Sequence, residues 1–291
     1  MDFVSTEDGS LTLRHAQTGE HYHNRAGAYT EALLCYVNPS GALKRLKRTR
    51  YLHLIDACFG LGYNSFVLLA EAIEQKLEGR VVIDAIDNDP NLVNALPTVL
   101  SFEKFKELGK IFELQKQVVT GPLSLIVRLH HSSLPQQLVR LREDNPNAEV
   151  DLVFHDPFSP NRMPELWTFE IFSLYKQLLR PDNGAVLTYS LATAVKGGFI
   201  QSGFSVGRTP KVGAKAGGTI AYLGGNSDCD FDFTELPADE LASLKTHSAI
   251  PYRDPELQLD RLAILKRRTI EQEQFKNISQ SQFTRQLPES I

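Results

Sequence analysis

Apolar and polar positions repeat along residues 51–225 in a strand-then-helix pattern. Apolar runs of strand length lie near residues 51–56, 81–86, 124–130, 150–155, 184–190 and 218–223. Segments with helical periodicity separate them, near residues 64–77, 90–105, 133–142, 165–180 and 193–202. Strands that alternate with helices usually pair in parallel, with helices covering both faces of the sheet. The pattern therefore predicts an α/β fold built on a parallel sheet.

Residues 1–50 lie outside this pattern, and we treat them as an N-terminal extension. They contain short strand-like pieces and a predicted helix near residues 28–37. Five basic residues follow between Lys44 and Arg50. Such a run could contact phosphates, or it could be the solvated end of a helix.

Residues 226–291 form a predicted C-terminal extension. Residues 226–245 are acidic and resemble a loop, whereas residues 256–275 have the pattern of one charged helix. The last 16 or so residues are polar enough to be disordered. The alternating segment between the two extensions, residues 51–225, is the expected catalytic or binding domain.

The composition excludes several classes of protein. The chain has 291 residues, of which 42% are hydrophobic and 23% charged, as in ordinary globular proteins. No apolar stretch is long enough to span a membrane and no signal-like leader is present, so we expect a cytoplasmic protein. Its three cysteines form no C-x-x-C pair, and H-E-x-x-H is absent, which disfavours a disulfide framework and a metal site. With a net charge of −4, any nucleic-acid binding must come from a local patch.

A glycine-containing turn follows the first strand of the alternating segment. Asp56 ends the strand, Gly60 and Gly62 follow, and a helix begins near Ser65. Such a loop lets a ligand approach the backbone, and the helix N-terminus offers unpaired N–H groups. Ser65 replaces the third glycine of the dinucleotide fingerprint, which disfavours a nicotinamide cofactor. An acid before the glycines is typical of sites for S-adenosylmethionine (SAM), although the glycines would equally suit a plain turn.

Two further acids follow strand ends. Asp87 ends the second strand, about 20 residues or slightly more past the glycines, where an acid can accept hydrogen bonds from both ribose hydroxyls. Asp156 ends the strand near residues 150–155. Because ligands bind beyond the carboxyl ends of parallel strands, we expect Asp56, Asp87 and Asp156 to converge on one site. The alternative is that Asp87 and Asp156 are ordinary turn residues.

Aromatic residues follow Asp156. Phe158 and Trp167, the only tryptophan, could stack on a flat base or form a wall of the site. Trp167 could equally fill the core.

Several segments together resemble one known family. They are Asp56-x-x-Phe-Gly-x-Gly-x-Asn64, Asp156-x-Phe-x-Pro160 with the later Pro-Glu-Leu-Trp-Thr, Thr188-Tyr-Ser190, His21 to Glu31, Gly203-Phe204 and Gly213-Ala-Lys215. Over about residues 8–223 the chain is similar to the methyltransferase half of MnmC, a bifunctional enzyme that modifies the wobble uridine of tRNA. That half also occurs as a stand-alone protein.

The resemblance implies a Rossmann-like, doubly wound SAM-dependent methyltransferase. Its implied substrate is the primary amine of 5-aminomethyl(-2-thio)uridine in the tRNA anticodon loop. A separate flavin-dependent enzyme would act in the same pathway, because we see no room for the flavin-dependent half. The resemblance implies Asp156 as the catalytic acid, beside the transferred methyl group. Implied cofactor-binding residues are Glu31, Asp56, Gly60, Gly62, Asn64 and Asp87, and expected substrate-binding residues are Phe158, Pro160, Trp167, Tyr189 and Lys215.

The chain departs from the family pattern at three places. Cys58 replaces the first glycine of the loop, and His130-His131 replaces the Gly-Asp whose acid meets the adenine amino group. The family's Lys-Arg-Glu is reduced to Lys215-Ala-Gly-Gly. Two other functions therefore stay open, namely methyl or aminopropyl transfer to a small amine, and RNA binding by a homologue with little affinity for the cofactor.

Overall fold

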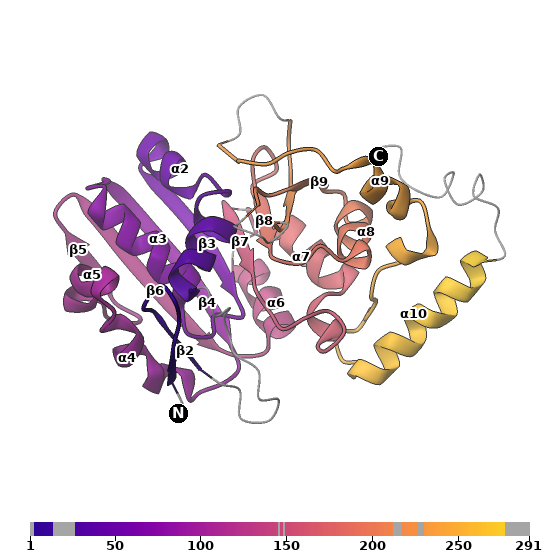
Figure 1. Cartoon of the computed structure of the whole chain (residues 1–291), viewed down its shortest axis with the longest axis horizontal. Helices are drawn as coiled ribbons and strands as arrows, with labels where there is room; N and C mark the ends of the chain where they lie inside the picture. Colours follow the sequence, from indigo (N-terminus) through magenta and orange to yellow (C-terminus); the bar gives the residue numbers. More distant parts are fainter. Residues whose placement is uncertain are drawn as a thin grey trace.

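The computed structural model describes residues 3–13, 27–144, 146–147, 149–211, 217–225 and 230–276. Its main sheet consists of β3 (Tyr51–Ala57), β4 (Gly79–Asp87), β5 (Gln117–Thr120), β6 (Leu123–His131), β7 (Leu152–His155), β8 (Ala185–Thr188), β9 (Ser205–Arg208) and β10 (Thr219–Tyr222). The strands follow the order β5-β6-β4-β3-β7-β8-β10-β9 (Figure 1). The five strands from β6 to β8 are parallel, which confirms the predicted α/β fold.

The two edges of the sheet differ from the prediction. β10 pairs antiparallel with β8 and with β9, and β5 pairs antiparallel with β6. The predicted parallel sheet is thus confirmed at its centre, and antiparallel strands extend it at both edges. A short connection can join antiparallel neighbours, as the turn at Gly121 and Pro122 does between β5 and β6, whereas a parallel pair needs a long crossover.

The helices lie on both faces of the sheet and beyond its β9 edge. They are α1 (Ala28–Ala32), the π-helix η1 (Leu33–Val37), α2 (Ala42–Thr49), α3 (Tyr63–Glu74), η2 (Leu92–Ala95), α4 (Leu96–Leu100), η3 (Glu103–Phe105), α5 (Lys106–Ile111), α6 (Leu134–Asp144), η4 (Pro164–Leu166), α7 (Phe169–Leu178), α8 (Thr193–Gln201), α9 (Ala238–Leu244), η6 (His247–Ala249) and α10 (Arg261–Lys276). A separate hairpin pairs β1 (Phe3–Ser5) with β2 (Leu11–Leu13). In Figure 1, β5 and α10 lie at opposite ends of the molecule. None of the helices in the described segments is long and apolar enough to cross a membrane.

Three helix predictions need correction. The helix expected over residues 90–105 is divided into η2, α4 and η3, because Pro97 starts a new helix and Phe102 is extended. Residues 226–245 contain α9, which begins after Pro237 with acidic residues in its first turn, a favourable place for them. The charged C-terminal helix begins at Arg261 rather than near residue 256. The tail predicted to be disordered lies outside the described residues.

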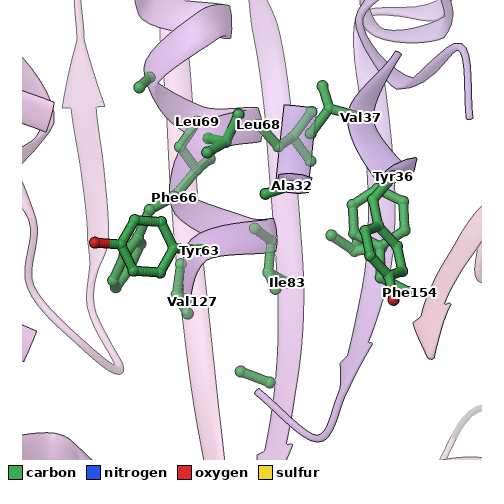
Figure 2. Close-up of a cluster of buried hydrophobic side chains, with 14 of the residues drawn as sticks. Ala32, Tyr36, Val37, Tyr63, Phe66, Leu68, Leu69, Ile83, Val127 and Phe154 are labelled. Carbon is green, nitrogen blue, oxygen red and sulfur yellow. The ribbon is translucent and has the colours of Figure 1, made fainter. Parts of the chain in front are cut away.

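Two hydrophobic clusters cover the two faces of the sheet. On one face, η1 and α3 pack on β3, β4, β6 and β7, and Figure 2 shows part of this cluster with Tyr36 and Phe154 side by side. On the other face the core is built around α6, α7 and α8. Both predicted extensions contribute, with Tyr29 and Leu46 in the first cluster and Tyr252 and Ile264 in the second. The extensions therefore pack against the alternating segment.

Intramolecular pairs account for three of the five basic residues between Lys44 and Arg50. Arg45 is buried and donates to Asp151 at 2.9 Å, Arg48 pairs with Asp230 at 2.6 Å, and Arg50 pairs with Glu78. These pairs lie at the amino end of β3. Asp56 and Asp156 lie at the other ends of these strands, the carboxyl ends.

Candidate active site

The loop between β3 and α3 is a tight turn. Both Cys58 and Phe59 donate their backbone N–H groups to the carbonyl of Ile86, at 3.0 Å. Gly60 and Gly62 have φ values of 55° and 78°, and a Cβ at Gly62 would lie 2.5 Å from the Phe59 ring. Position 62 therefore requires glycine on both conformational and steric grounds. The turn places the N-terminus of α3 at the carboxyl edge of the sheet.

Cys58 adopts a conformation that suits glycine better. Its φ is 67°, in the left-handed region. A non-glycine residue there costs roughly 1–2 kcal/mol. The residue that replaces the family's first glycine is thus accommodated with a strained backbone, and the loop keeps its shape.

Asp56 is fully buried beneath this loop. Ser65 Oγ donates to its Oδ2 at 2.5 Å, and its Oδ1 has no hydrogen-bond partner. Burial raises the pKa of Asp56 to about 7, and the charges of Asp156 and Asp87 act in the same direction. A buried acceptor without a partner is uncommon and calls for a ligand or another explanation. A cationic group bound above the loop would favour the ionised form of Asp56.

Asp87 ends β4 and is tied to the same loop. The backbone N–H groups of Gly60 and Asp89 donate to its two carboxylate oxygens, at 2.9 and 3.0 Å. Burial raises the pKa of Asp87, while these backbone hydrogen bonds lower it. Two carboxylate oxygens together offer about four acceptor sites, and not all of them are taken by these backbone donors. Asp87 can thus shape the loop and still accept hydrogen bonds from a ligand's hydroxyl groups.

Asp156 follows β7 and is half-buried. Its backbone N–H donates to the carbonyl of Ala57 at 3.1 Å, and the amide of Asn64 donates to its Oδ2 at 2.9 Å. Because Asn64 lies in the first turn of α3, the hydrogen bond ties the acid to the glycine loop. The structure thus brings together the three acids that the sequence placed at strand ends.

The segment after Asp156 is fixed by side chains beneath it. Tyr189 donates its hydroxyl to the carbonyl of Pro157, and Trp167 donates Nε1 to the carbonyl of Phe158, both at 2.9 Å. Phe158 and Tyr189 are half-buried and keep some exposed surface. Each can therefore still contact a substrate.

Two of the predicted substrate-binding residues are buried in this structure. Trp167 has no exposed surface and packs edge-on against His155, with ring centroids 4.5 Å apart. Pro160 is also buried. A fully buried ring cannot stack on a base, so Trp167 supports the loop from within the core.

The histidines that replace the family's Gly-Asp have different surroundings. His130 Nε2 lies 2.7 Å from Asp84 Oδ1, and Asp84 also contacts His53 Nε2 at 2.8 Å. His130 therefore already has a carboxylate partner on the neighbouring strand. His131 is exposed and stands beside Asp87 in the β4–β6 register, so it is the better placed of the two to meet a base.

The positions of two predicted residues, Glu31 and Lys215, leave their roles as predictions. Glu31 is half-buried in the first turn of α1, a helix that packs against α3. Its role over the cofactor stays a prediction. Lys215 lies outside the described residues, as does most of the predicted segment from His21 onward.

Sequence reasoning missed Tyr36. Its ring packs on Phe154 with centroids 5.5 Å apart, and its buried hydroxyl has no hydrogen-bond partner in suitable geometry. Burial, and then the charge of Asp156, raise the pKa of Tyr36 well above its usual value. A tyrosine in an apolar helical stretch carries no local signal for such a position.

Comparisons with known proteins show which family and fold this chain resembles. A family described as "S-adenosyl-L-methionine-dependent methyltransferase" matches residues 116–224. An uncharacterised protein of Methanocaldococcus jannaschii is 27% identical over 94% of this chain and 73% of its own length. The crystal structure of MnmC2 from Aquifex aeolicus matches with a TM-score of 0.74 and 29% identity, over 94% of this chain and 85% of that one.

Bifunctional relatives match as well. The tRNA 5-methylaminomethyl-2-thiouridine biosynthesis bifunctional protein MnmC of Chromohalobacter salexigens is 33% identical over 68% of this chain. The chain spans only 29% of that protein, and 31% to 32% of two others with the same name.

Proposed function

Because the chain is an MnmC-like, SAM-dependent methyltransferase, we propose that it methylates the aminomethyl group of 5-aminomethyl(-2-thio)uridine at the wobble position of tRNA. The bifunctional relatives are named for biosynthesis of 5-methylaminomethyl-2-thiouridine, which is the product of such a transfer. The observation that carries the proposal is the half-buried Asp156, held by Asn64 at 2.9 Å beside the glycine loop. A tRNA substrate implies a cytoplasmic enzyme, and a separate enzyme would supply the aminomethyl group.

The described residues fit SAM. Asp56 is buried beneath the turn formed by Gly60 and Gly62, where its negative charge would attract the cationic methionine end without touching it. Asp87 has lone pairs for the ribose hydroxyls, and the exposed His131 stands next to it. When bound, SAM supplies an electrophilic methyl group on a sulfonium, whose charge lowers the pKa of a neighbouring ammonium.

Asp156 has a specific task in this reaction. An alkylamine has a pKa near that of lysine, about 10.4, so it is mostly protonated at neutral pH and lacks a lone pair. The Asp156 carboxylate can attract the ammonium and then accept or relay its proton. Its hydrogen bond from Asn64 fixes it relative to the loop that holds the methyl donor. Such alignment can supply up to roughly 7–11 kcal/mol of the barrier.

The proposal is tested with tRNA that carries 5-aminomethyl-2-thiouridine. We expect the purified protein and SAM to convert it to the methylated nucleoside, detected by nucleoside mass spectrometry. Tests with tRNA bearing an unmodified wobble uridine and with free polyamines run in parallel. Methylation or aminopropylation of the free polyamines alone would show a small-amine enzyme and contradict the proposal. No turnover combined with no SAM binding would favour the RNA-binding homologue.

A substitution at Asp87 tests the cofactor role. Asp87→Asn should weaken SAM binding about 10-fold or more, because a hydrogen bond to a charged group contributes roughly 1.5–3 kcal/mol. Calorimetry measures the change. Asp144→Asn, at the exposed end of α6, is the control and should bind SAM normally. Unchanged affinity in Asp87→Asn would show that the carboxylate serves only the loop.

A further inference from the structure

Tyr36 occupies an unusual position in the fold. It lies in the π-helix η1, is 1% exposed and packs its ring against Phe154 (Figure 2). π-helices are rare and frequently occur at functional sites. The element that carries Tyr36 packs on α3 and β8, next to the strand that leads to Asp156.

The strand places Tyr36 near the catalytic acid. Phe154 and Asp156 are two residues apart, so their side chains leave the extended chain on the same side. Asn64 also reaches Asp156 from this side, from the first turn of α3. A ring that packs against Phe154, as that of Tyr36 does, therefore lies on the same side of the strand as the Asp156 side chain.

The hydroxyl of Tyr36 lacks a hydrogen-bond partner in suitable geometry although it is buried. Leaving a buried donor unsatisfied destabilises the folded state. The charge of Asp156 is close enough to contribute to the raised pKa of Tyr36, so the phenol keeps its proton. A hydrogen-bond contribution from Asp156 also raises this pKa, so the carboxylate is the nearest candidate acceptor for the O–H.

We propose that Tyr36 is a positioning residue for Asp156, with its phenol O–H donating to one carboxylate oxygen while Asn64 donates to the other. Two donors on the buried side would direct the remaining lone pairs of Asp156 toward the ammonium of the substrate. The inference rests on the proposed role of Asp156 but not on the identity of the amine. Tyr36 itself does not touch the substrate.

The test uses Tyr36→Phe, which keeps the ring on Phe154 and removes only the hydroxyl. Sinefungin is a SAM analogue with an amine in place of the methylsulfonium, and S-adenosylhomocysteine has no charge there. We expect the preference for sinefungin over S-adenosylhomocysteine, measured by calorimetry, to fall about tenfold. Stability to urea should fall only slightly, because the variant removes one hydroxyl and keeps the packed ring.

Tyr29→Phe is the matched control. Tyr29 is also buried, but its hydroxyl donates to Glu71 at 2.6 Å on the outer part of α3. This variant should lose stability and keep the sinefungin preference. In an Asp156→Asn background, Tyr36→Phe should have no additional effect on that preference, because Tyr36 acts through the acid.

The outcomes separate this inference from the proposed function. A normal sinefungin preference in Tyr36→Phe would overturn the inference even if the enzyme methylates tRNA. A reduced preference without activity on tRNA would support Tyr36 and refute the proposed substrate. Failure of Tyr36→Phe to fold would also contradict the inference, since loss of one hydroxyl should not unfold the protein.

Discussion

Asp156→Asn is expected to lower turnover with modified tRNA by about 10²- to 10⁴-fold, the usual contribution of a positioned acid or base. The amide is isosteric and can still accept the hydrogen bond from Asn64. It cannot attract the ammonium or take its proton. SAM affinity should stay close to that of the wild type, because Asp56 and Asp87 keep their positions. Single-turnover rates and calorimetry measure the two quantities separately.

Asp144→Asn is the control for the loss of one negative charge, because it removes a carboxylate at the exposed end of α6. This variant should keep normal turnover. Asp156→Asn with an unchanged single-turnover rate would show that the amine loses its proton elsewhere. Equal losses of SAM affinity and rate would indicate that Asp156 binds the cofactor instead.

The parallel centre of the fold follows from local sequence. β3, β4 and β7 are short apolar runs bounded by turn residues, so their limits could be predicted closely. The edges were harder, because β5 is short and half-exposed, and the antiparallel β9–β10 pairing depends on tertiary contacts. α9 was missed because its acidic residues also suit a loop.

The sequence could predict those site residues that lie at the carboxyl end of a strand. Asp56, Asp87 and Asp156 each end a strand of a parallel sheet, so topology alone brings them together. Trp167 shows the limit of this reasoning, because an aromatic residue that follows an acid in sequence can equally belong to the core. Trp167 has no exposed surface and is such a core residue. The position of Tyr36 could not be predicted, because its contact with Phe154 joins segments more than a hundred residues apart in the sequence.

Asp56→Asn is expected to stabilise the protein at alkaline pH in the absence of SAM. The raised pKa of about 7, against an ordinary 3.8, means that folding favours the protonated acid. Its contribution to stability is therefore complete below about pH 4 and is lost as the pH rises to about 7. At about 1.4 kcal/mol per pKa unit, the penalty above pH 7 is on the order of 4 kcal/mol. The uncharged amide avoids it and can still bond Ser65.

Urea unfolding at several pH values measures this effect. The stability difference between Asp56→Asn and wild type should grow by about 1.4 kcal/mol per pH unit between pH 5 and 7, and then level off. SAM affinity should fall in the same variant, because the negative charge that faces the cationic methionine end is lost. Wild-type SAM binding near pH 7 should release a proton, visible as a dependence of the calorimetric enthalpy on the buffer. A stability difference that does not change with pH would mean that Asp56 is already ionised in the free protein, with its charge stabilised by its surroundings.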